Sequence, residues 1–141
     1  KLVVVHGTEA HLLPELLARE HIPVITGPIL TDRSKPELAN STSANPALLA
    51  KAGVEIAICT DHPVIPIQHL TLCAAVAARS GLEPEEALKA ITLNGARLAG
   101  VDHRVGSLTP GKDADVVVTS GHPLDWMSRV EHVFIDGVQV K

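Results

Sequence analysis

Aromatic residues are almost absent from this sequence of 141 residues: Trp126 and Phe134 are the only two, and together they make up 1%. Hydrophobic residues of all kinds make up 45%, so the chain can bury a core, and that core must be aliphatic. Aliphatic residues suit parallel strands that are buried on both faces. The scarcity of aromatic rings argues against a surface on which single-stranded nucleic acid would stack.

A net positive charge is lacking, and cysteine is scarce. The net charge is −4 with histidine neutral, and the Lys and Arg residues are scattered. Because no basic stripe is present, we expect no nucleic-acid partner. The two cysteines, Cys59 and Cys73, lie among apolar residues and outside any C-x-x-C spacing. We interpret them as free, buried thiols in a reducing compartment.

Long hydrophobic runs are lacking. No stretch approaches the roughly 20 apolar residues that span a bilayer, and the first residues show no signal-peptide pattern. We therefore expect no membrane partner and a cytoplasmic location. The sequence starts without Met and within an apolar run at residues 2–5, which we interpret as a cut in a longer chain.

Short apolar runs alternate with helical patterns over the first 100 residues. Strands are predicted at 2–5, 22–26 and 54–60, and helices from about residue 12, at 46–51, from 66 to 81 and from 83 to 100. A polar loop at 31–46 interrupts this order. The order predicts a parallel sheet, as in an α/β barrel or a doubly wound fold. No nucleotide-binding glycine motif or G-x-S-x-G motif follows a strand, so neither a nucleotide-binding fold nor a serine hydrolase is supported.

The pattern changes after residue 100. Residues 105–112 are rich in turn formers, strands are predicted at 116–118 and 130–135, and Asp136-Gly137 predicts a hairpin turn into 138–140. We interpret Asp113 and Asp115 as turn and capping residues. A domain boundary is therefore predicted near 100–105, with one domain over 1–100 and an antiparallel unit over 101–141.

Two predicted strands end in polar residues. His6 closes the first strand, and Asp61 follows the third in Thr60-Asp61-His62-Pro63. In α/β barrels, chemistry is carried at the carboxyl ends of parallel strands. A histidine and an aspartate at that edge suggest a metal-dependent site. Taken alone, His6 also fits a hydrogen-bonded structural residue, and Asp61 also fits a helix N-cap before Pro63.

Four stretches resemble the C-terminal part of amidohydrolase-superfamily enzymes, in the branch that contains imidazolonepropionase. They are residues 6–11 (HGTEAH), 60–63 (TDHP), 91–96 (ITLNGA) and 105–115 (VGSLTPGKDAD). The resemblance covers essentially the whole chain, although Gly95 stands where relatives often carry proline. It implies the last three strands and helices of a (β/α)8 TIM barrel over 1–100, followed by part of a small β-sandwich over 101–141.

The resemblance also implies roles for the site residues. Asp61 would end the eighth barrel strand and act as metal ligand and general base, and His6 would end the sixth as metal ligand or electrophile. The cofactor would be a divalent metal, Zn in particular, with one or two ions in the intact enzyme. His11 and His62 are candidate substrate-binding residues; capping or a surface position is the alternative for His11, and packing for His62.

This chemistry requires more ligands than the sequence contains. A divalent cation lowers the pKa of bound water to roughly 7, and a carboxylate can take up the proton and return it to a leaving nitrogen. Catalytic zinc sites use about three protein ligands. The family's other ligands lie on strands that would precede this sequence, so we expect metal binding by this chain alone to be weak or absent.

We therefore expect the C-terminal fragment of a metal-dependent amidohydrolase. The parent enzyme would hydrolyse a non-standard C–N bond, in a cyclic amide or another small-molecule amide, and the isolated fragment would be inactive. One alternative is a prolidase-like dipeptidase of the same superfamily. Another is a non-catalytic fragment that self-associates into a homo-oligomer through the open edges of its barrel strands.

Overall fold

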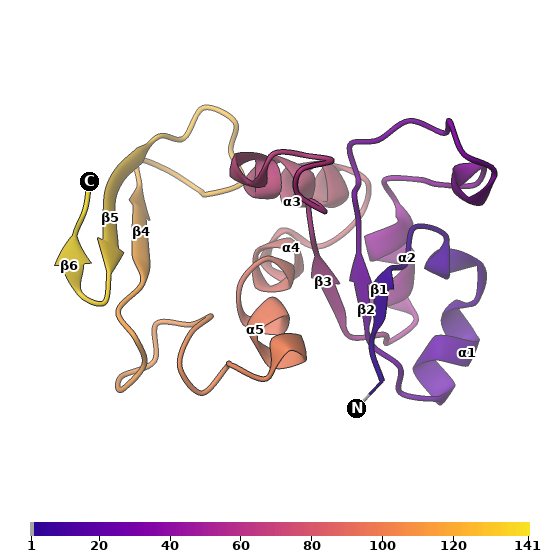
Figure 1. Cartoon of the computed structure of the whole chain (residues 1–141), viewed down its shortest axis with the longest axis horizontal. Helices are drawn as coiled ribbons and strands as arrows, with labels where there is room; N and C mark the ends of the chain where they lie inside the picture. The colour runs from indigo at the N-terminus through magenta and orange to yellow at the C-terminus, as the bar shows by residue number, and fades with distance from the viewer. Residues whose placement is uncertain (1) are drawn as a thin grey trace.

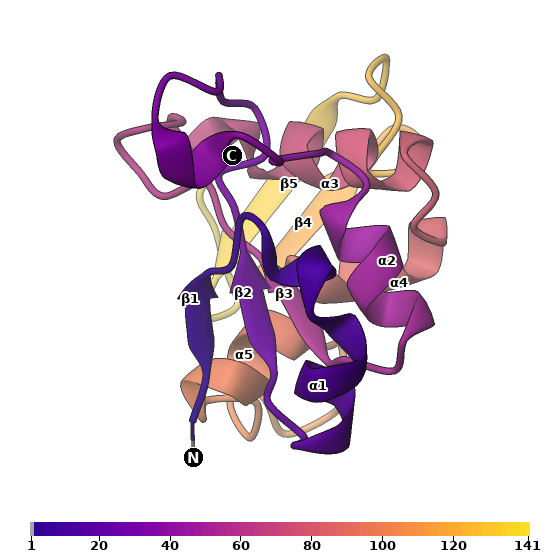
Figure 2. The ribbon, with the colours of Figure 1, turned by 90° about the vertical axis from the view of Figure 1, so that its right-hand side faces the viewer.

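The computed structural model describes residues 2–141, which form a parallel sheet and an antiparallel sheet of three strands each. In the first sheet, β1 (Val4–His6), β2 (Val24–Thr26) and β3 (Ile56–Ile58) lie in the order β1-β2-β3. His6 pairs in register with Thr26, and Thr26 pairs with Ile58. The predicted α/β class and the three parallel strands are confirmed, and all three strands end at the same edge (Figure 2).

Helices connect and follow these strands. Between them lie η1 (Ala10–Leu12), α1 (Pro14–Arg19), η2 (Pro36–Leu38) and α2 (Asn45–Lys51). After β3 come η3 (Ile67–His69), α3 (Leu70–Arg79), α4 (Pro84–Ala90) and α5 (Leu93–Ala99). In Figure 1, α1 and α2 lie on one side of the strands, whereas α3, α4 and α5 lie between β3 and the second sheet.

The core lies where the helices pack on the parallel sheet, and it is aliphatic, as the composition predicted. Val24 and Leu49 are fully buried at its centre, and small residues of α3 and α4 fill the space beside them. The buried members are Leu17, Val24, Leu49, Val54, Ile56, Ile58, Cys73, Ala74, Ala77, Leu82, Ala87 and Ala90.

The opposite face of the parallel sheet is partly open. Strand residues alternate between the two faces, so Val5, Ile25 and Ala57 share the face opposite Val24 and Ile56. Ala57 is buried, but Val5 on the edge strand is 57% exposed. An exposed valine in a parallel strand is unusual, because parallel sheets are normally covered on both faces.

The single helix predicted over residues 83–100 was wrong, because the structure has two helices there. The chain breaks at Thr92, whose backbone angles are φ −130° and ψ −94°. Its hydroxyl donates to the carbonyl of Leu88 at 2.7 Å, a local bond that competes with helical hydrogen bonding. The predicted start of the first helix near residue 12 is also shifted, since η1 precedes α1 at Pro14.

The second sheet is antiparallel, with β4 (Val116–Thr119), β5 (Val130–Ile135) and β6 (Val138–Gln139) in the order β4-β5-β6. Asp136 and Gly137 have φ values of 48° and 76°, as a two-residue type I′ hairpin turn requires. The predicted hairpin is therefore confirmed.

The two carboxylates before β4 hold turns, as predicted. Asp113 accepts a hydrogen bond from Arg104, which raises the pKa of the guanidinium above its ordinary value. Asp115 accepts one from the backbone N–H of Asp136 at 3.0 Å. The segment before β4 is thus bonded both to Arg104, beyond the end of α5, and to the hairpin.

Within residues 2–141, no helix combines the length and the apolar character needed to cross a membrane.

Candidate functional site

His6 and Asp61 meet at the carboxyl edge of the parallel sheet. His6 is the last residue of β1, and Asp61 lies in the turn after β3. Their side chains reach across the end of β2, so that Nε2 of His6 lies 3.0 Å from Oδ1 of Asp61. The side chains are 56% and 34% exposed, respectively. The two polar groups at this edge are therefore in contact with each other and accessible to solvent.

Both residues have a left-handed backbone conformation, with φ values of 70° at His6 and 53° at Asp61. Such angles cost a non-glycine residue about 1–3 kcal/mol and cluster at functional sites. Among residues 2–141, two other non-glycine residues have positive φ and have ordinary explanations, since His21 follows the end of α1 and Asp136 lies in the hairpin turn. His6 ends one strand and Asp61 lies in the turn after another, so two residues with left-handed angles meet at one edge of the sheet, which points to a site.

Backbone hydrogen bonds hold the turn that carries Asp61. The carbonyl of Asp61 accepts from the N–H of Val64 at 2.8 Å, and the carbonyl of buried Thr60 accepts from Ile65 at 3.2 Å. Gly27, just after β2, packs directly on Cys59: a Cβ at Gly27 would overlap the carbonyl oxygen of Cys59. The ends of β2 and β3 are therefore locked together beside Asp61.

Asn45 is the residue at this edge that sequence reasoning missed. It begins α2 and is only 2% exposed. Its Oδ1 accepts from the backbone N–H of His11 at 2.9 Å and from the ring Nδ1 of His11 at 3.1 Å. Its Nδ2 donates to the carbonyl of Gly7 at 2.8 Å and to Oγ1 of Thr26 at 2.6 Å. The sequence placed Asn45 in a polar loop, and only its position before Pro46, at a helix start, set it apart.

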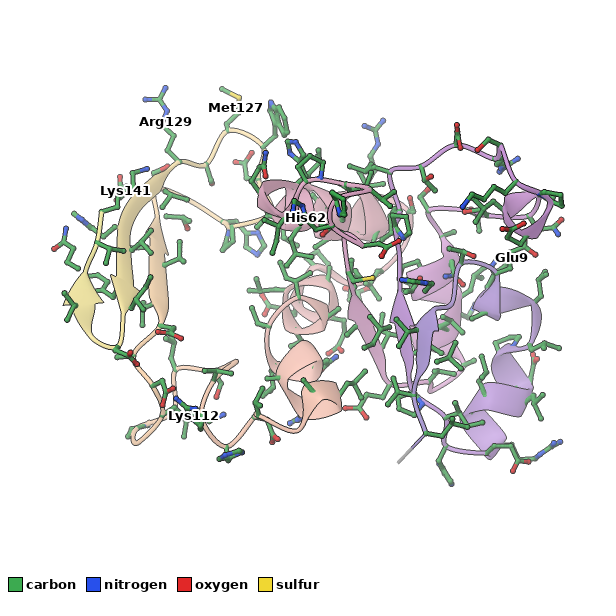
Figure 3. The ribbon with its side chains drawn as sticks, in the orientation of Figure 1. Glu9, His62, Lys112, Met127, Arg129 and Lys141 are labelled. Carbon is green, nitrogen blue, oxygen red and sulfur yellow. The ribbon has the colours of Figure 1, made fainter. Side chains whose placement is uncertain are left out.

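The two candidate substrate-binding histidines have different surroundings in the structure. His11 is half-buried in η1 and bonds to Asn45. His62 is exposed beside Asp61, at the end of the molecule where the strands end (Figure 3). Glu9, also labelled there, accepts from the backbone N–H of Asn40 at 2.7 Å and so links the loop after β1 to the loop after β2.

The donor set of His6 and Asp61 fits a divalent metal only in part. An imidazole nitrogen and a carboxylate oxygen are both common zinc ligands. Among residues 2–141, however, no group of three or more His, Cys, Asp or Glu side chains is placed to hold a metal ion. The pair therefore fits two ligands of a metal site, and further ligands would have to complete it.

The cysteines offer no nucleophile to this site. Both are free; Cys73 is buried, as predicted, whereas Cys59 is only half-buried. Burial raises the pKa of each thiol above its ordinary value. Both thiols are therefore protonated near neutral pH, and a protonated thiol is a poor nucleophile.

A cavity of about 1100 Å³ lies between α3–α5 and the second sheet. Its lining is mostly apolar and includes Leu88, Val117 and Trp126. None of the four predicted site residues lines it. The cavity is therefore distinct from the His6–Asp61 pair.

The chain is similar to curated proteins over a small part of their length. It is 33% identical to the amidohydrolase tasK of Hapsidospora irregularis over 137 residues, which are 94% of this chain and 14% of that protein. It is 42% identical to the imidazolonepropionase of Geobacillus kaustophilus over 79 residues, 54% of this chain and 19% of that protein. The chain thus spans less than a fifth of the length of these relatives.

Solved structures match the whole chain. An amidohydrolase from Thermotoga maritima MSB8 superposes with a TM-score of 0.95 and 51% identity, covering 100% of this chain and 37% of that one. An adenosine deaminase from Xanthomonas campestris with bound Zn superposes with a TM-score of 0.69 and 26% identity. The match covers 98% of this chain and 36% of the deaminase chain. The sequence profile of the Amidohydrolase family matches residues 1–140. The chain, with its histidine–aspartate pair at the ends of parallel strands, therefore belongs to the amidohydrolase family.

Proposed function

We propose that this chain supplies the last three strands and helices of the (β/α)8 barrel of a metal-dependent amidohydrolase, together with part of a β-sandwich. The enzyme would hydrolyse a C–N bond other than a standard peptide bond, in a cyclic amide or a related small amide. Relatives named amidohydrolase and imidazolonepropionase support this reaction class. Because the chain spans only part of these relatives, the 141 residues alone are expected to be inactive.

The contact between His6 and Asp61 carries the proposal. Nε2 and Oδ1 lie 3.0 Å apart although the residues are 55 positions apart in sequence and lie at the ends of strands that are not neighbours. Both have the left-handed backbone conformation that is typical of functional sites. A purely structural N-cap role for Asp61 is not supported, because Asp61 bonds to His6 and the residue before η3 is Pro66.

His6 and Asp61 fit as two ligands of one divalent metal ion. His6 would hold it through Nε2 and Asp61 through its carboxylate, with the remaining ligands on strands outside this sequence. When bound, the metal would activate water and polarise the substrate. Asp61 would accept a proton from the attacking water and deliver it to the leaving nitrogen, while His6 would orient or polarise the substrate if it does not ligate.

The test is the substitution Asp61→Asn in the complete enzyme, meaning this chain joined to the missing barrel strands. The amide keeps the size of the side chain but cannot take up a proton, and general-base catalysis contributes about 10²–10⁴-fold. Turnover of amide substrates is expected to fall by at least about 100-fold. Near-normal turnover would overturn the assignment. Asp32→Asn is the control, because Asp32 lies in the exposed loop after β2 and its carboxylate accepts hydrogen bonds from Ser34 of the same loop.

The prolidase-like alternative uses the same residues and differs only in substrate. A panel that pairs cyclic amides with Xaa-Pro dipeptides separates the two candidates, since each enzyme class would turn over only one half of the panel. The first candidate is favoured, because the amidohydrolase tasK and the imidazolonepropionase of Geobacillus kaustophilus are 33% and 42% identical to this chain over the residues they match.

A further inference from the structure

Asn45 uses the full hydrogen-bonding capacity of its side chain. A primary amide can donate two hydrogen bonds and accept two, and Asn45 makes all four while 2% exposed. Fully satisfied buried polar groups of this kind rigidify and specify their surroundings. Two of the four partners matter for the site: Gly7 directly follows His6, and Thr26 pairs with His6 across the sheet.

The same four bonds fix the tautomer of His11. The N–H of His11 can only donate and the carbonyl of Gly7 can only accept, so these backbone partners settle which end of the Asn45 amide is oxygen. Nδ1 of His11 lies 3.1 Å from that oxygen, which can only accept. Nδ1 must therefore carry the proton, and Nε2 of the neutral ring keeps its lone pair.

We propose that Asn45 is a positioning residue for this site: its amide ties the loop after His6 to the end of β2 and holds His11 as the Nδ1–H tautomer. The inference rests on the proposed function in one respect: the site that Asn45 orders is the His6–Asp61 pair. The same carbonyl-to-imidazole bond orients histidines that ligate metals or handle protons in enzymes, where its loss costs about 10- to 100-fold in activity or metal affinity.

Two substitutions separate the two parts of this role. Asn45→Asp keeps an acceptor for His11 but loses both donated bonds, to Gly7 and to Thr26. Asn45→Ala removes all four bonds. The matched control is Asn94→Ala, since Asn94 is also buried and its Nδ2 donates to the backbone carbonyl of Ile56 at 3.0 Å, in β3 and away from His11.

The experiment is two-bond ¹H–¹⁵N NMR of the histidine rings of the 141-residue chain at about pH 8.5, two units above the ordinary histidine pKa near 6.5. In the wild-type chain, His11 is expected as the Nδ1–H tautomer, and Asn45→Asp should retain it. Asn45→Ala should release His11 to a mixture of tautomers. Both variants should shift the backbone amide signals of His6 and Asp61, whereas Asn94→Ala should leave the tautomer and these signals unchanged.

If the wild-type chain shows His11 as the Nε2–H tautomer, that spectrum alone overturns the inference. Unchanged His6 and Asp61 signals in Asn45→Ala, or equal shifts in Asn94→Ala, would also overturn it. In the complete enzyme, Asn45→Ala should lower kcat about 10-fold or more and change KM less. If the NMR result holds but the wild-type enzyme hydrolyses no amide, the proposed function fails and the link from Asn45 to His6 stands.

Discussion

His6 and Asp61 keep their strained backbone because neighbouring residues leave them little freedom. Asp61 is held by the hydrogen bonds of the turn that follows it, and His6 precedes Gly7, whose carbonyl is bonded by buried Asn45. Gly7 in turn packs on Val24 so closely that a Cβ at Gly7 would lie 2.4 Å from the valine side chain. The two site residues are thus placed by small, buried contacts just outside the strands.

Gly27 is the most restrictive of these neighbours, and Gly27→Ala tests it. Its φ of 145° strains any side chain, and a Cβ would overlap Cys59 at the end of β3. Backbone strain of about 1–2 kcal/mol and overpacking of about 1–3 kcal/mol should together lower the unfolding free energy by about 3 kcal/mol in urea denaturation.

Gly53→Ala is the control for this prediction. Gly53 also has a positive φ, 86°, but a Cβ there would meet no atom within 4 Å. Only the strain of about 1–2 kcal/mol should remain. Equal losses in the two variants would show that contact with Cys59 does not matter.

The buried thiols predict a loss of stability at alkaline pH. Burial raises the pKa of Cys59 and Cys73 in the folded chain above the value in the unfolded chain, near 8.5. The stabilisation that comes from keeping these two thiols protonated is therefore fully present below about pH 8.5. It is lost as the pH rises through the pKa values of the folded chain.

Urea unfolding at a series of pH values measures this loss. The free energy of unfolding should fall more steeply above about pH 8.5 in the wild-type chain than in Cys59→Ala combined with Cys73→Ala. Parallel curves for the two proteins would contradict the prediction, even if the variant is less stable at every pH.

At the scale of elements, α2 anchors the parallel sheet through one side of the helix. Leu49 is fully buried against the sheet, whereas its neighbour Leu48 is 43% exposed. Leu49→Ala should cost about 2–5 kcal/mol of unfolding free energy, the usual cost of emptying a buried leucine site. Leu48→Ala should cost far less, and thermal unfolding of both variants checks the difference; similar losses would show that α2 is not packed as described.

The elements that could be predicted from sequence are those specified by neighbouring residues. The parallel strands follow from short apolar runs, and the hairpin follows from Asp136-Gly137. The break at Thr92 is only partly local. The Thr92 hydroxyl bonds to nearby Leu88, but the segment around Gly106 also packs against Thr92: a Cβ at Gly106 would lie 3.2 Å from the Thr92 carbonyl oxygen. The role of Asn45 was hidden for the same reason: its partners Gly7 and Thr26 are 38 and 19 residues away. The contact of His6 with Asp61 could be predicted only because the carboxyl ends of parallel strands lie at one edge of the sheet.

At the scale of the whole molecule, the parallel sheet has two unpaired edges, at β1 and at β3, within the part of the chain that the structure describes. Unpaired edges and exposed apolar residues such as Val5 favour association with other strands. We therefore expect the isolated chain to form oligomers at micromolar concentration, as measured by light scattering.

A charge on the exposed sheet face tests where the copies meet. Val5→Lys should shift the chain toward monomer, because an edge-strand lysine disfavours strand pairing. Leu108→Lys is the control, since Leu108 is 82% exposed but lies in a loop outside both sheets. A wild-type chain that is monomeric, or equal effects of the two substitutions, would contradict this expectation.

The central claim is that His6 and Asp61 are two ligands of one catalytic metal site. The most direct measurement is the divalent-metal content of the complete enzyme, purified without chelator, for wild type, His6→Ala and Asp61→Asn. We predict about one or two ions per wild-type chain, as catalytic metal sites hold. Both His6→Ala and Asp61→Asn should clearly lower the metal content, with hydrolysis lost alongside the metal. Full metal content and unchanged hydrolysis in both variants would contradict the account.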